Sequence, residues 1–402
     1  MSDEHTVGDF VTLRRGTTYK GALVGEPGPA LLGLGSIVPG GGFRSDYKTY
    51  GGDCPPELML LPGDLFVSLK GATKDGDMIG SIARVPASVP MGRVTQDTVK
   101  LVFHERSSDL ERYLYWILRT PQYRTYCAAR ATGSAVVGLS REDFLSYPVP
   151  ALTPPRRHLV AVLENIEEKL GSNQRSIACL QELIRLHFQA ALQSGEARHV
   201  PLGEVVAVTK GRSYKSAELV PSTTALVTLK SIDRSGGYKP DGLKPYAGPY
   251  KPEQVVEPGD LVVAQTDLTQ GAEVVGRGVR VPRSNDYATL VASLDLAIVR
   301  PVDGMPSEYL IGLLTSEDFR QHCRSRTSGT TVLHLGKDAI PTWPAPLIAP
   351  EDQEAYASVV RPLFARMDAL RHEQERLDQT RVALLPELHL GRVSLRIARE
   401  VA

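Results

Sequence analysis

The chain of 402 residues contains few cysteines and no long apolar run. The cysteines form no Cys-x-x-Cys pair, which disfavours a structural zinc site or a disulfide framework and favours a reducing compartment. No stretch approaches the roughly 18 apolar residues that a membrane span needs, and the start Met1–His5 is acidic where a secretory signal is basic. We therefore expect a cytoplasmic protein without a membrane partner. The four cysteines are Cys54, Cys127, Cys179 and Cys323.

The motifs of several enzyme classes are also missing. A DNA amino-methyltransferase needs an Asn/Asp-Pro-Pro-aromatic turn, but Asn165, Asn173 and Asn285, the asparagines of this chain, all lack a following proline. No phosphate-binding Gly-x-x-x-x-Gly-Lys-Ser/Thr loop, no Gly-x-Ser-x-Gly elbow and no His-Glu-x-x-His pair occurs. We therefore expect no catalytic residue, no metal ligand and no cofactor in this chain.

The formal net charge of the chain is zero, so the chain as a whole is not attracted to a polyanion. Lys plus Arg number 46 and Asp plus Glu also number 46, so a nucleic-acid site has to arise from a local concentration of charge. The length predicts two or more domains, each large enough to bury its own core.

The second half of the chain repeats the first. Gly16–Lys20 (GTTYK) returns as Gly211–Lys215 (GRSYK), 195 positions later (16 to 211). Pro62–Leu65 (PGDL) returns as Pro258–Leu261 with an offset of 196 (62 to 258). A long, nearly gap-free match of this kind indicates a tandem duplication. Further pairs are Gly80–Pro86 with Gly276–Pro282, and Cys127 with Cys323.

The first part of each repeat, residues 7–150 and 200–346, reads as a compact α+β domain. Gly and Pro punctuate short β-branched runs such as Leu261–Val263 and Leu296–Val299, which predict strands. Helical periodicity follows over 110–130 and 307–326. Cys127 and Cys323 are predicted to be small buried apolar residues of these domains.

The second part of each repeat has the 4-3 apolar spacing of a coiled-coil seam. Two such helices in one chain are expected to pack on each other. Pro362 predicts a short helix, a kink and a long helix from about Leu363, while Gly195 and Gly391 mark the helix ends. A spacer helix of about 22 to 25 residues would span roughly 33 to 38 Å. The predicted seam residues are Leu163, Ile166, Leu170, Ile177, Leu180, Leu363, Leu370, Leu377 and Leu384.

Three polar residues interrupt the seam: Asn173, Gln374 and Arg381. They are either ordinary interruptions of a marginal seam or polar contacts that fix its register, and the spacing does not separate these interpretations.

Positive charge is concentrated at the same place in both repeats. The segment from Lys210 to Lys251 contains eight basic and three acidic residues. A weaker basic stretch occupies the equivalent part of the first repeat. A charged run is often only a solvated face, but its recurrence favours DNA binding. The candidate residues here are Arg14, Arg15, Tyr19, Lys20, Arg212, Tyr214, Lys215, Lys230, Arg234 and Lys239.

Two further loops suit contact with a duplex. Polar loops after each Pro-Gly-Asp differ between the repeats while their flanks agree, so they are candidates for reading base edges. The Arg130–Ser134 and Arg326–Thr330 loops offer hydroxyls and an arginine for phosphates, with a simple helix-closing turn as the alternative. The candidates are Lys70, Thr73, Lys74, Gln265, Thr266 and Gln270 for bases, and Arg130, Ser134, Arg326 and Thr330 for phosphates.

The order of these motifs resembles the type I restriction-modification DNA specificity subunit. The Pro-Gly-Asp-Leu strand, polar loop, Thr-Gly-Ser or Ser-Gly-Thr loop, Pro-rich exit and long helix occur twice, and Leu384–Arg392 resembles the ending of that family. The resemblance implies target-recognition domains at 1–150 and 199–346, a spacer helix at 151–198, and a second spacer helix with a C-terminal tail at 347–402. Each domain would read half of a bipartite, interrupted site.

The resemblance also implies partners. Two methyltransferase subunits would dock on the helices and would bind S-adenosylmethionine, and a restriction or translocase subunit is compatible with the same assembly. Two alternatives remain open: a sequence-tolerant nucleic-acid-binding scaffold, and a coiled-coil protein-interaction module.

Overall fold

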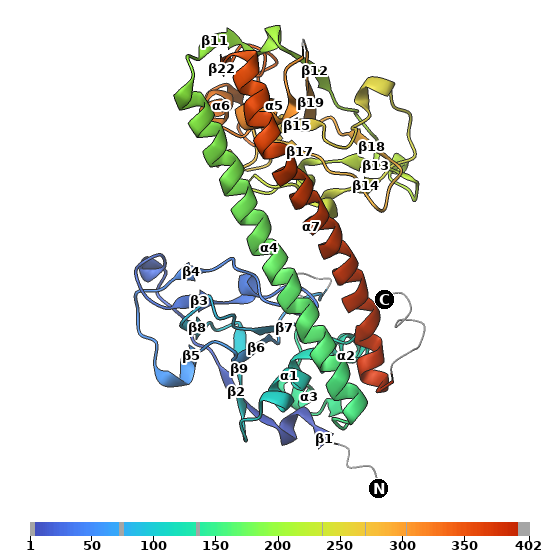
Figure 1. Cartoon of the computed structure of the whole chain (residues 1–402). Coiled ribbons are helices and arrows are strands. Elements are labelled where there is room, and N and C mark those ends of the chain that lie inside the picture. Colours follow the sequence, from blue (N-terminus) through green and yellow to red (C-terminus); the bar gives the residue numbers. More distant parts are fainter. Residues whose placement is uncertain are drawn as a thin grey trace. The chain divides into compact units, whose positions relative to one another are not determined.

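The two repeats fold into two units, shown in the computed structural model of Figure 1. Unit 1 comprises residues 1–171 and 375–402, and unit 2 comprises residues 172–374. The structure describes residues 5–71, 76–133, 137–234, 236–269, 271–302 and 304–392.

Unit 1 is built on two small sheets. The first is antiparallel with the order β2-β9-β6-β7, and the second has the order β4-β3-β8-β5 with β3 and β8 parallel. A further pair, β1 with β10, joins the two ends of the domain. The strands are β1 His5–Thr6, β2 Val11–Arg15, β3 Ala30–Leu32, β4 Lys48–Thr49, β5 Met59–Leu60, β6 Leu65–Ser68, β7 Ile82–Arg84, β8 Gly92–Val94, β9 Thr98–Phe103 and β10 Pro148–Val149.

Unit 2 repeats this topology. Its central sheet has the order β12-β19-β15-β17, β13 and β18 are again parallel in a second sheet, and β11 pairs with β22. A third sheet has the order β16-β21-β20. The prediction of two α+β domains is confirmed. The strands are β11 Arg198–Pro201, β12 Val206–Lys210, β13 Thr224–Val227, β14 Lys244–Pro245, β15 Leu261–Ala264, β16 Thr266–Asp267, β17 Gly278–Arg280, β18 Thr289–Ala292, β19 Leu296–Pro301, β20 Thr327–Ser328, β21 Leu333–Leu335 and β22 Pro344–Leu347.

Each predicted helical segment near the end of a domain is two helices. Thr120 caps the second helix of unit 1 by accepting a hydrogen bond from the Tyr123 amide, and Pro121 occupies its first turn. Ser316 is the equivalent cap in unit 2. Capping by these residues outweighs the continuous apolar periodicity. The helices are α1 Ser108–Ile117, α2 Pro121–Arg130, α3 Arg141–Leu145, α5 Ser307–Leu314 and α6 Glu317–Arg324.

The repeated cysteines pack against repeated glycines. Cys127 and Cys323 are buried, as predicted. Gly80 and Gly276 have φ of +73° and +76°, and a Cβ added at either would lie 2.5 Å from an atom of the cysteine beside it. Both the backbone conformation and the close approach therefore require glycine.

The two long helices are α4, Pro154–Ser194, and α7, Pro350–Leu390, each of 41 residues. At 1.5 Å per residue each is about 60 Å long, so the shorter spacer expected from the sequence is wrong. The predicted break at Pro362 is also wrong, because α7 is continuous through it. Pro362 lies on the exposed face, and buried Val360 and Phe364 hold the helix from its other side.

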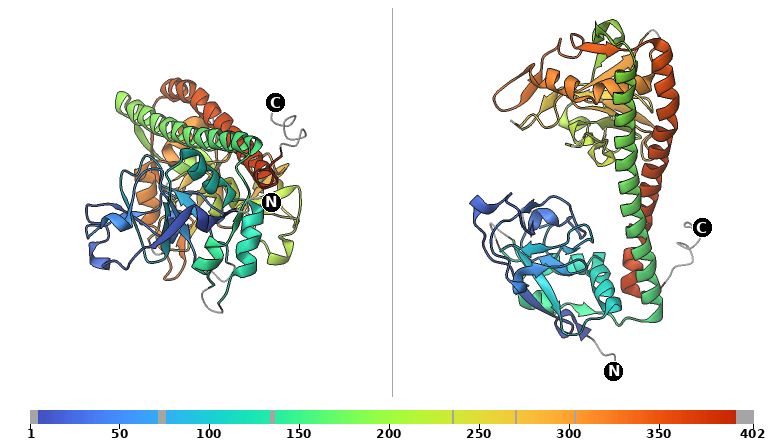
Figure 2. Two further views of the ribbon diagram at one scale, coloured as in Figure 1. Left: turned by 90° about the horizontal axis from the view of Figure 1, so that it is seen from below. Right: turned by 60° about the vertical axis from the view of Figure 1, so that its left-hand side comes forward.

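The long helices pack antiparallel within each unit (Figures 1 and 2). In unit 1 the first part of α4 shares a core with the last part of α7, and in unit 2 the second part of α4 shares a core with the first part of α7. The predicted seam residues divide accordingly. Those of unit 1 are Leu163, Ile166, Leu170, Leu377 and Leu384, and those of unit 2 are Ile177, Leu180, Leu363 and Leu370.

The polar seam residues do not behave alike. Asn173 is buried and its amide donates to Glu373 at 2.8 Å, while Gln374 donates to Gln174 at 3.2 Å, both across the helix pair of unit 2. Arg381 instead pairs with Asp378 one turn away on its own helix. The contact of Asn173 favours the register-fixing interpretation for this residue. Among the described residues, no helix is long and apolar enough to span a bilayer.

Candidate nucleic-acid interface

A turn between two strands joins the predicted loops of unit 1. The turn lies between β8 and β9, and its Gln96 carbonyl accepts a hydrogen bond from Arg15 Nε at 3.3 Å. On its other side, Lys70 Nζ pairs with Asp97 at 2.8 Å. The basic segment that starts at the end of β2 and the polar loop after β6 therefore meet at one place, although Arg15 and Lys70 are 55 positions apart in the sequence (15 to 70).

Unit 2 has a junction of the equivalent segments, held by different hydrogen bonds. The Leu294 amide, in the turn between β18 and β19, donates to the Arg212 carbonyl at 2.7 Å. The next residue, Asp295, accepts hydrogen bonds from the Thr266 hydroxyl at 3.0 Å and from the Gln265 amide at 2.8 Å. In both units, therefore, the basic segment and the polar loop contact the same turn.

The predicted phosphate loops join this junction. In unit 1, Gly138 forms β-bridges with both Lys70 and Thr132. In unit 2, β21 pairs with β16 on one side and β20 on the other. We call this surface, which each unit has separately, the polar edge. It comprises residues 14–20, 68–71, 95–97, 130–133 and 137–139 in unit 1, and 210–215, 264–269, 293–295 and 326–335 in unit 2.

The basic segment of unit 1 lines a pocket of about 890 Å³. Arg14, Arg15, Tyr19 and Lys20 were expected from the sequence and are all exposed here. The pocket also contains residues that sequence reasoning missed, because they come from distant segments and no repeat or motif marks them. These are Tyr50, Arg93 and Arg141, and the acidic Asp53 and Glu57 also line the pocket.

Arg93 shapes this pocket from within. It is buried, its Nε donates to the Asp53 carbonyl at 2.9 Å, and an NH2 group donates to the Thr17 hydroxyl at 2.9 Å. Its guanidinium lies 5.0 Å from the centre of the Tyr50 ring. In unit 2, Arg212 occupies the comparable place, and its Nε donates to the Tyr246 hydroxyl at 3.4 Å. Arg212 therefore supports the fold as well as carrying charge.

Some of the other candidate residues of unit 2 belong to the polar edge and others lie outside it. Lys215 is exposed, and Tyr214 is half-buried beneath the Lys244 ammonium, 5.9 Å from its ring centre. Three exposed residues lie outside the polar edge: Lys230; Arg234, which pairs with Glu273; and Lys239, which pairs with Asp233.

The phosphate-loop candidates are exposed at the ends of α2 and α6. The Arg130 guanidinium lies 3.8 Å from the centre of the Tyr126 ring and 3.8 Å from Asp143. Arg326 donates to the Ser325 hydroxyl at 3.3 Å, and Thr330 is exposed beyond β20. Candidates Thr73, Lys74, Ser134 and Gln270 lie outside the described residues.

A buried carboxylate shapes the polar loop of unit 2. Asp267 accepts hydrogen bonds from the Thr269 amide and hydroxyl, both at 2.8 Å, and from the Val274 and Val275 amides at 2.6 and 3.2 Å. Burial raises the pKa of Asp267, but the hydrogen bonds from Val274 and Thr269 outweigh it and hold the pKa below its ordinary value of 3.8. The loop is therefore organised around a charged Asp267.

This arrangement changes which side chains of the loop face outward. Thr266 is buried with its hydroxyl bonded to Asp295, so it supports the loop and is not exposed for base contact. Gln265 is half-buried. Leu268, which sequence reasoning missed, is 73% exposed at the tip. An apolar residue in a polar run gives no sequence signal of exposure, because exposure depends on the loop conformation.

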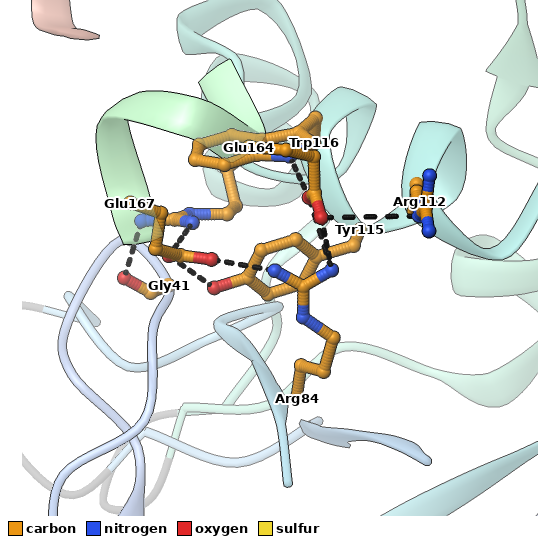
Figure 3. Close-up of polar contacts among 8 residues, drawn as sticks. Gly41, Arg84, Arg112, Tyr115, Trp116, Glu164 and Glu167 are labelled. Carbon is orange, nitrogen blue, oxygen red and sulfur yellow. Dashed lines mark hydrogen bonds and ion pairs between the residues drawn. The ribbon is translucent and has the colours of Figure 1, made fainter. Parts of the chain in front are cut away.

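An ionic cluster attaches the domain of unit 1 to α4 (Figure 3). Arg84 pairs with Glu164 at 2.8 Å and with Glu167 at 2.7 Å. Arg119, which is almost fully buried, pairs with Glu167 at 2.9 Å, and the Trp116 indole donates to Glu164 at 2.5 Å. Burial raises the pKa of Glu167, but Arg119 and Arg84 outweigh it and lower the pKa below its ordinary value of 4.5.

Among the residues that the structure describes, fewer ion pairs attach the domain of unit 2 to α7 than attach the domain of unit 1 to α4. Arg280, the repeat equivalent of Arg84 (84 to 280), pairs with Asp368 at 2.7 Å, and its guanidinium lies 5.4 Å from the centre of the Phe364 ring. An arginine on the last strand of the central sheet therefore contacts a long helix in both units.

We expect Glu167→Gln to destabilise unit 1 in a pH-dependent way. Because the folded pKa is lowered, the stabilisation is complete above the ordinary pKa and is lost as the pH falls through the folded pKa. At pH 7 the substitution should lower the free energy of unfolding by about 2 kcal/mol, and the difference should shrink below about pH 4. Urea unfolding followed by circular dichroism measures this. Glu168→Gln, an exposed neighbour on α4, is the control, and an equal effect of both variants would contradict the ionic explanation.

Within the described ranges, no group of three His, Cys, Asp or Glu side chains is placed to hold a metal ion. The polar edge instead offers guanidinium, ammonium, amide and hydroxyl donors, which suit the oxygens of phosphates and bases.

Compared with models of protein families, the chain matches none. The type I restriction enzyme MjaVIII specificity subunit of Methanocaldococcus jannaschii is 18% identical over 328 residues, which cover 76% of this chain and 75% of that protein. The crystal structure of a type I restriction-modification system S subunit from M. genitalium has 15% sequence identity and superposes with a TM-score of 0.58, covering 97% of this chain and 96% of that one. The resemblance that the repeated motifs indicated is thus confirmed: this chain is similar, in sequence and in fold, to the specificity subunits of type I restriction enzymes.

Proposed function

We propose that this chain is the DNA sequence-recognition subunit of a type I restriction-modification complex. Each unit would read one half of a bipartite, interrupted DNA site through its polar edge. The observation that carries the proposal is the duplication of this edge, in which the equivalent segments meet in both units while the side chains that they expose differ. A repeated frame with different contact residues suits recognition of two different half-sites.

The division of labour within each edge follows from contact chemistry. Exposed cations hold phosphates and add affinity for any duplex, and Arg14, Arg15, Lys215 and Arg326 are suited to this. Side chains at the loop tips discriminate between bases. Lys70 suits guanine acceptors once it leaves its partly exposed partner Asp97, because such an ion pair contributes about 1 kcal/mol or less.

The tip in unit 2 has a different chemistry. Gln265 can donate and accept hydrogen bonds at a base edge, and exposed Leu268 suits an apolar contact such as a thymine methyl group. Because Asp267 fixes the loop around them, less conformational freedom would be lost on binding.

Catalysis would belong to partner subunits. We propose that two methyltransferase subunits, carrying S-adenosylmethionine, dock on α4 and α7, and that a restriction subunit can join the same cytoplasmic complex. Large apolar side chains are exposed on both helices, including Leu183 and Leu186 on α4 and Val382 on α7. Burial of such side chains supports helix docking.

The test separates positioning contacts from reading contacts in the purified complex. The methylated sequence in cells that carry the gene, compared with cells that lack it, defines the cognate duplex. Lys215→Ala should weaken binding to cognate and random duplexes alike and lower the salt slope by about one. A double substitution, Gln265→Ala with Leu268→Ala, should reduce discrimination at one half-site by about 1 to 3 kcal/mol and leave the other half-site unchanged.

The control for lost charge is Lys251→Ala, because Lys251 is exposed but lies outside the polar edge. Equal binding of all duplexes by the wild-type complex, with a steep salt dependence, would contradict the proposal and favour the sequence-tolerant scaffold. Absence of any duplex binding would favour the interaction module.

A further inference from the structure

The loop after β6 is held at its far end by an arginine of α2. One NH2 group of Arg124 donates to the Asp77 carbonyl at 2.6 Å. Its other terminal nitrogen donates to the Ile79 carbonyl and lies 3.4 Å from the Ser81 hydroxyl. One guanidinium therefore spans the segment through which the loop returns to β7.

Unit 2 repeats this contact at the equivalent positions. Arg320 of α6 stands 196 positions after Arg124, and Glu273 stands 196 positions after Asp77. Arg320 donates to the Glu273 carbonyl at 3.4 Å, and Arg277 Nε donates to the same carbonyl at 2.6 Å. The contact has been retained although the side chains of the two loops differ.

The type of acceptor explains how one device can serve two loops. In both units the arginines bond to main-chain carbonyls, which every residue offers whatever its side chain. The same helices also fix Gly80 and Gly276, whose positive φ and close packing against Cys127 and Cys323 set the direction of the chain. Loop side chains can therefore vary without loss of the contacts that place the loop.

We propose that Arg124 and Arg320 are positioning residues for DNA sequence reading, each acting through the loop of its own unit. Neither contacts a base; each holds the returning segment of the loop, 76–81 or 271–276, in place. We call these contacts the carbonyl clamps. This inference rests on the proposed function, because it assigns a role within the reading of half-sites.

Loss of one clamp should affect one half-site only. Arg124→Ala should lower discrimination between the cognate duplex and single mismatches in the first half-site by about 10-fold, with mismatches in the second half-site discriminated as before. Arg320→Ala should show the reverse. A purely structural role would instead lower the amount of folded complex or the affinity for both half-sites together.

The experiment uses the complex with its co-expressed methyltransferase subunits. Binding to cognate and singly mismatched duplexes measures discrimination at each half-site, and hydrogen exchange in the DNA-free complex measures protection of 76–81 and 271–276. Matched controls are Thr125→Ala and Gln321→Ala, which are exposed, equivalent positions beside the two arginines. Arg124→Lys, which keeps the charge without the fork of donors, should restore discrimination only partly and carries the test if Arg124→Ala folds poorly.

Faster exchange confined to the segment of the altered unit, together with relaxed reading of its half-site, would support the proposal. If the wild-type complex discriminates between half-site sequences and Arg124→Ala and Arg320→Ala discriminate equally well, the role proposed for the carbonyl clamps is wrong. The proposed function would then still stand. Failure of the wild-type complex to discriminate would overturn the proposed function and the clamp with it.

Discussion

Exchange of residues 7–150 for the corresponding domain of another specificity subunit should change only one half of the methylated sequence. The polar edge of unit 1 is built from residues within this range, and its supporting contacts from Arg15 and Lys70 also lie within it. The polar edge of unit 2 lies outside the exchanged residues, so its half-site should stay the same.

The structure shows what such an exchange has to preserve. Arg84, Trp116 and Arg119 of the exchanged domain contact Glu164 and Glu167 on α4, so a donor without matching side chains would leave half-buried carboxylates unpaired. Transfer of residues 154–171 with the domain avoids this mismatch. Sequencing of methylated DNA from cells that carry each chimera measures the outcome.

The reciprocal exchange of residues 200–346 is the internal control and should change the other half. A change of both halves by either exchange, or of neither, would contradict independent reading by the two units.

Replacement of Leu163 by Asp should unfold unit 1. Leu163 is fully buried in the core that contains Trp116, Leu384 and Leu388, so the new carboxylate would have to lose its hydration or disrupt the packing of α4 on α7. A buried charge without a partner costs on the order of several kcal/mol. This is a large part of the free energy of unfolding of a typical domain, which is about 5 to 15 kcal/mol.

Urea unfolding should show loss of the unit 1 transition, and the variant should fail to co-purify with methyltransferase subunits. Ala161→Asp, an exposed position two residues away on the same helix, should retain both properties. Co-purification of a stably folded Leu163→Asp protein would contradict the packing described for the seam.

Sequence patterns were sufficient wherever the signal was local or periodic. The duplication, the 4-3 spacing of residues such as Leu163 and Leu384, and the small buried cysteines all follow from residue type at fixed intervals, because helix and strand periods are properties of the backbone. Candidates such as Arg14, Lys20 and Lys215 could be selected because the same charge recurs at the same place. Pro362 misled the prediction, because a local penalty was outweighed by packing along the rest of α7.

The sequence by itself therefore determined that the chain has two α+β domains, two long helices and a basic segment in each repeat. Only the tertiary structure decided that Arg15 and Lys70 meet at the Gln96–Asp97 turn, that Thr266 is buried while Leu268 is exposed, and that Arg124 holds the Asp77 carbonyl. Each of these contacts joins segments that lie far apart in the chain or depends on the path of a loop. Such contacts depend on which strands pair, and pairing is set by the packing of the whole domain, which no short pattern of residues encodes.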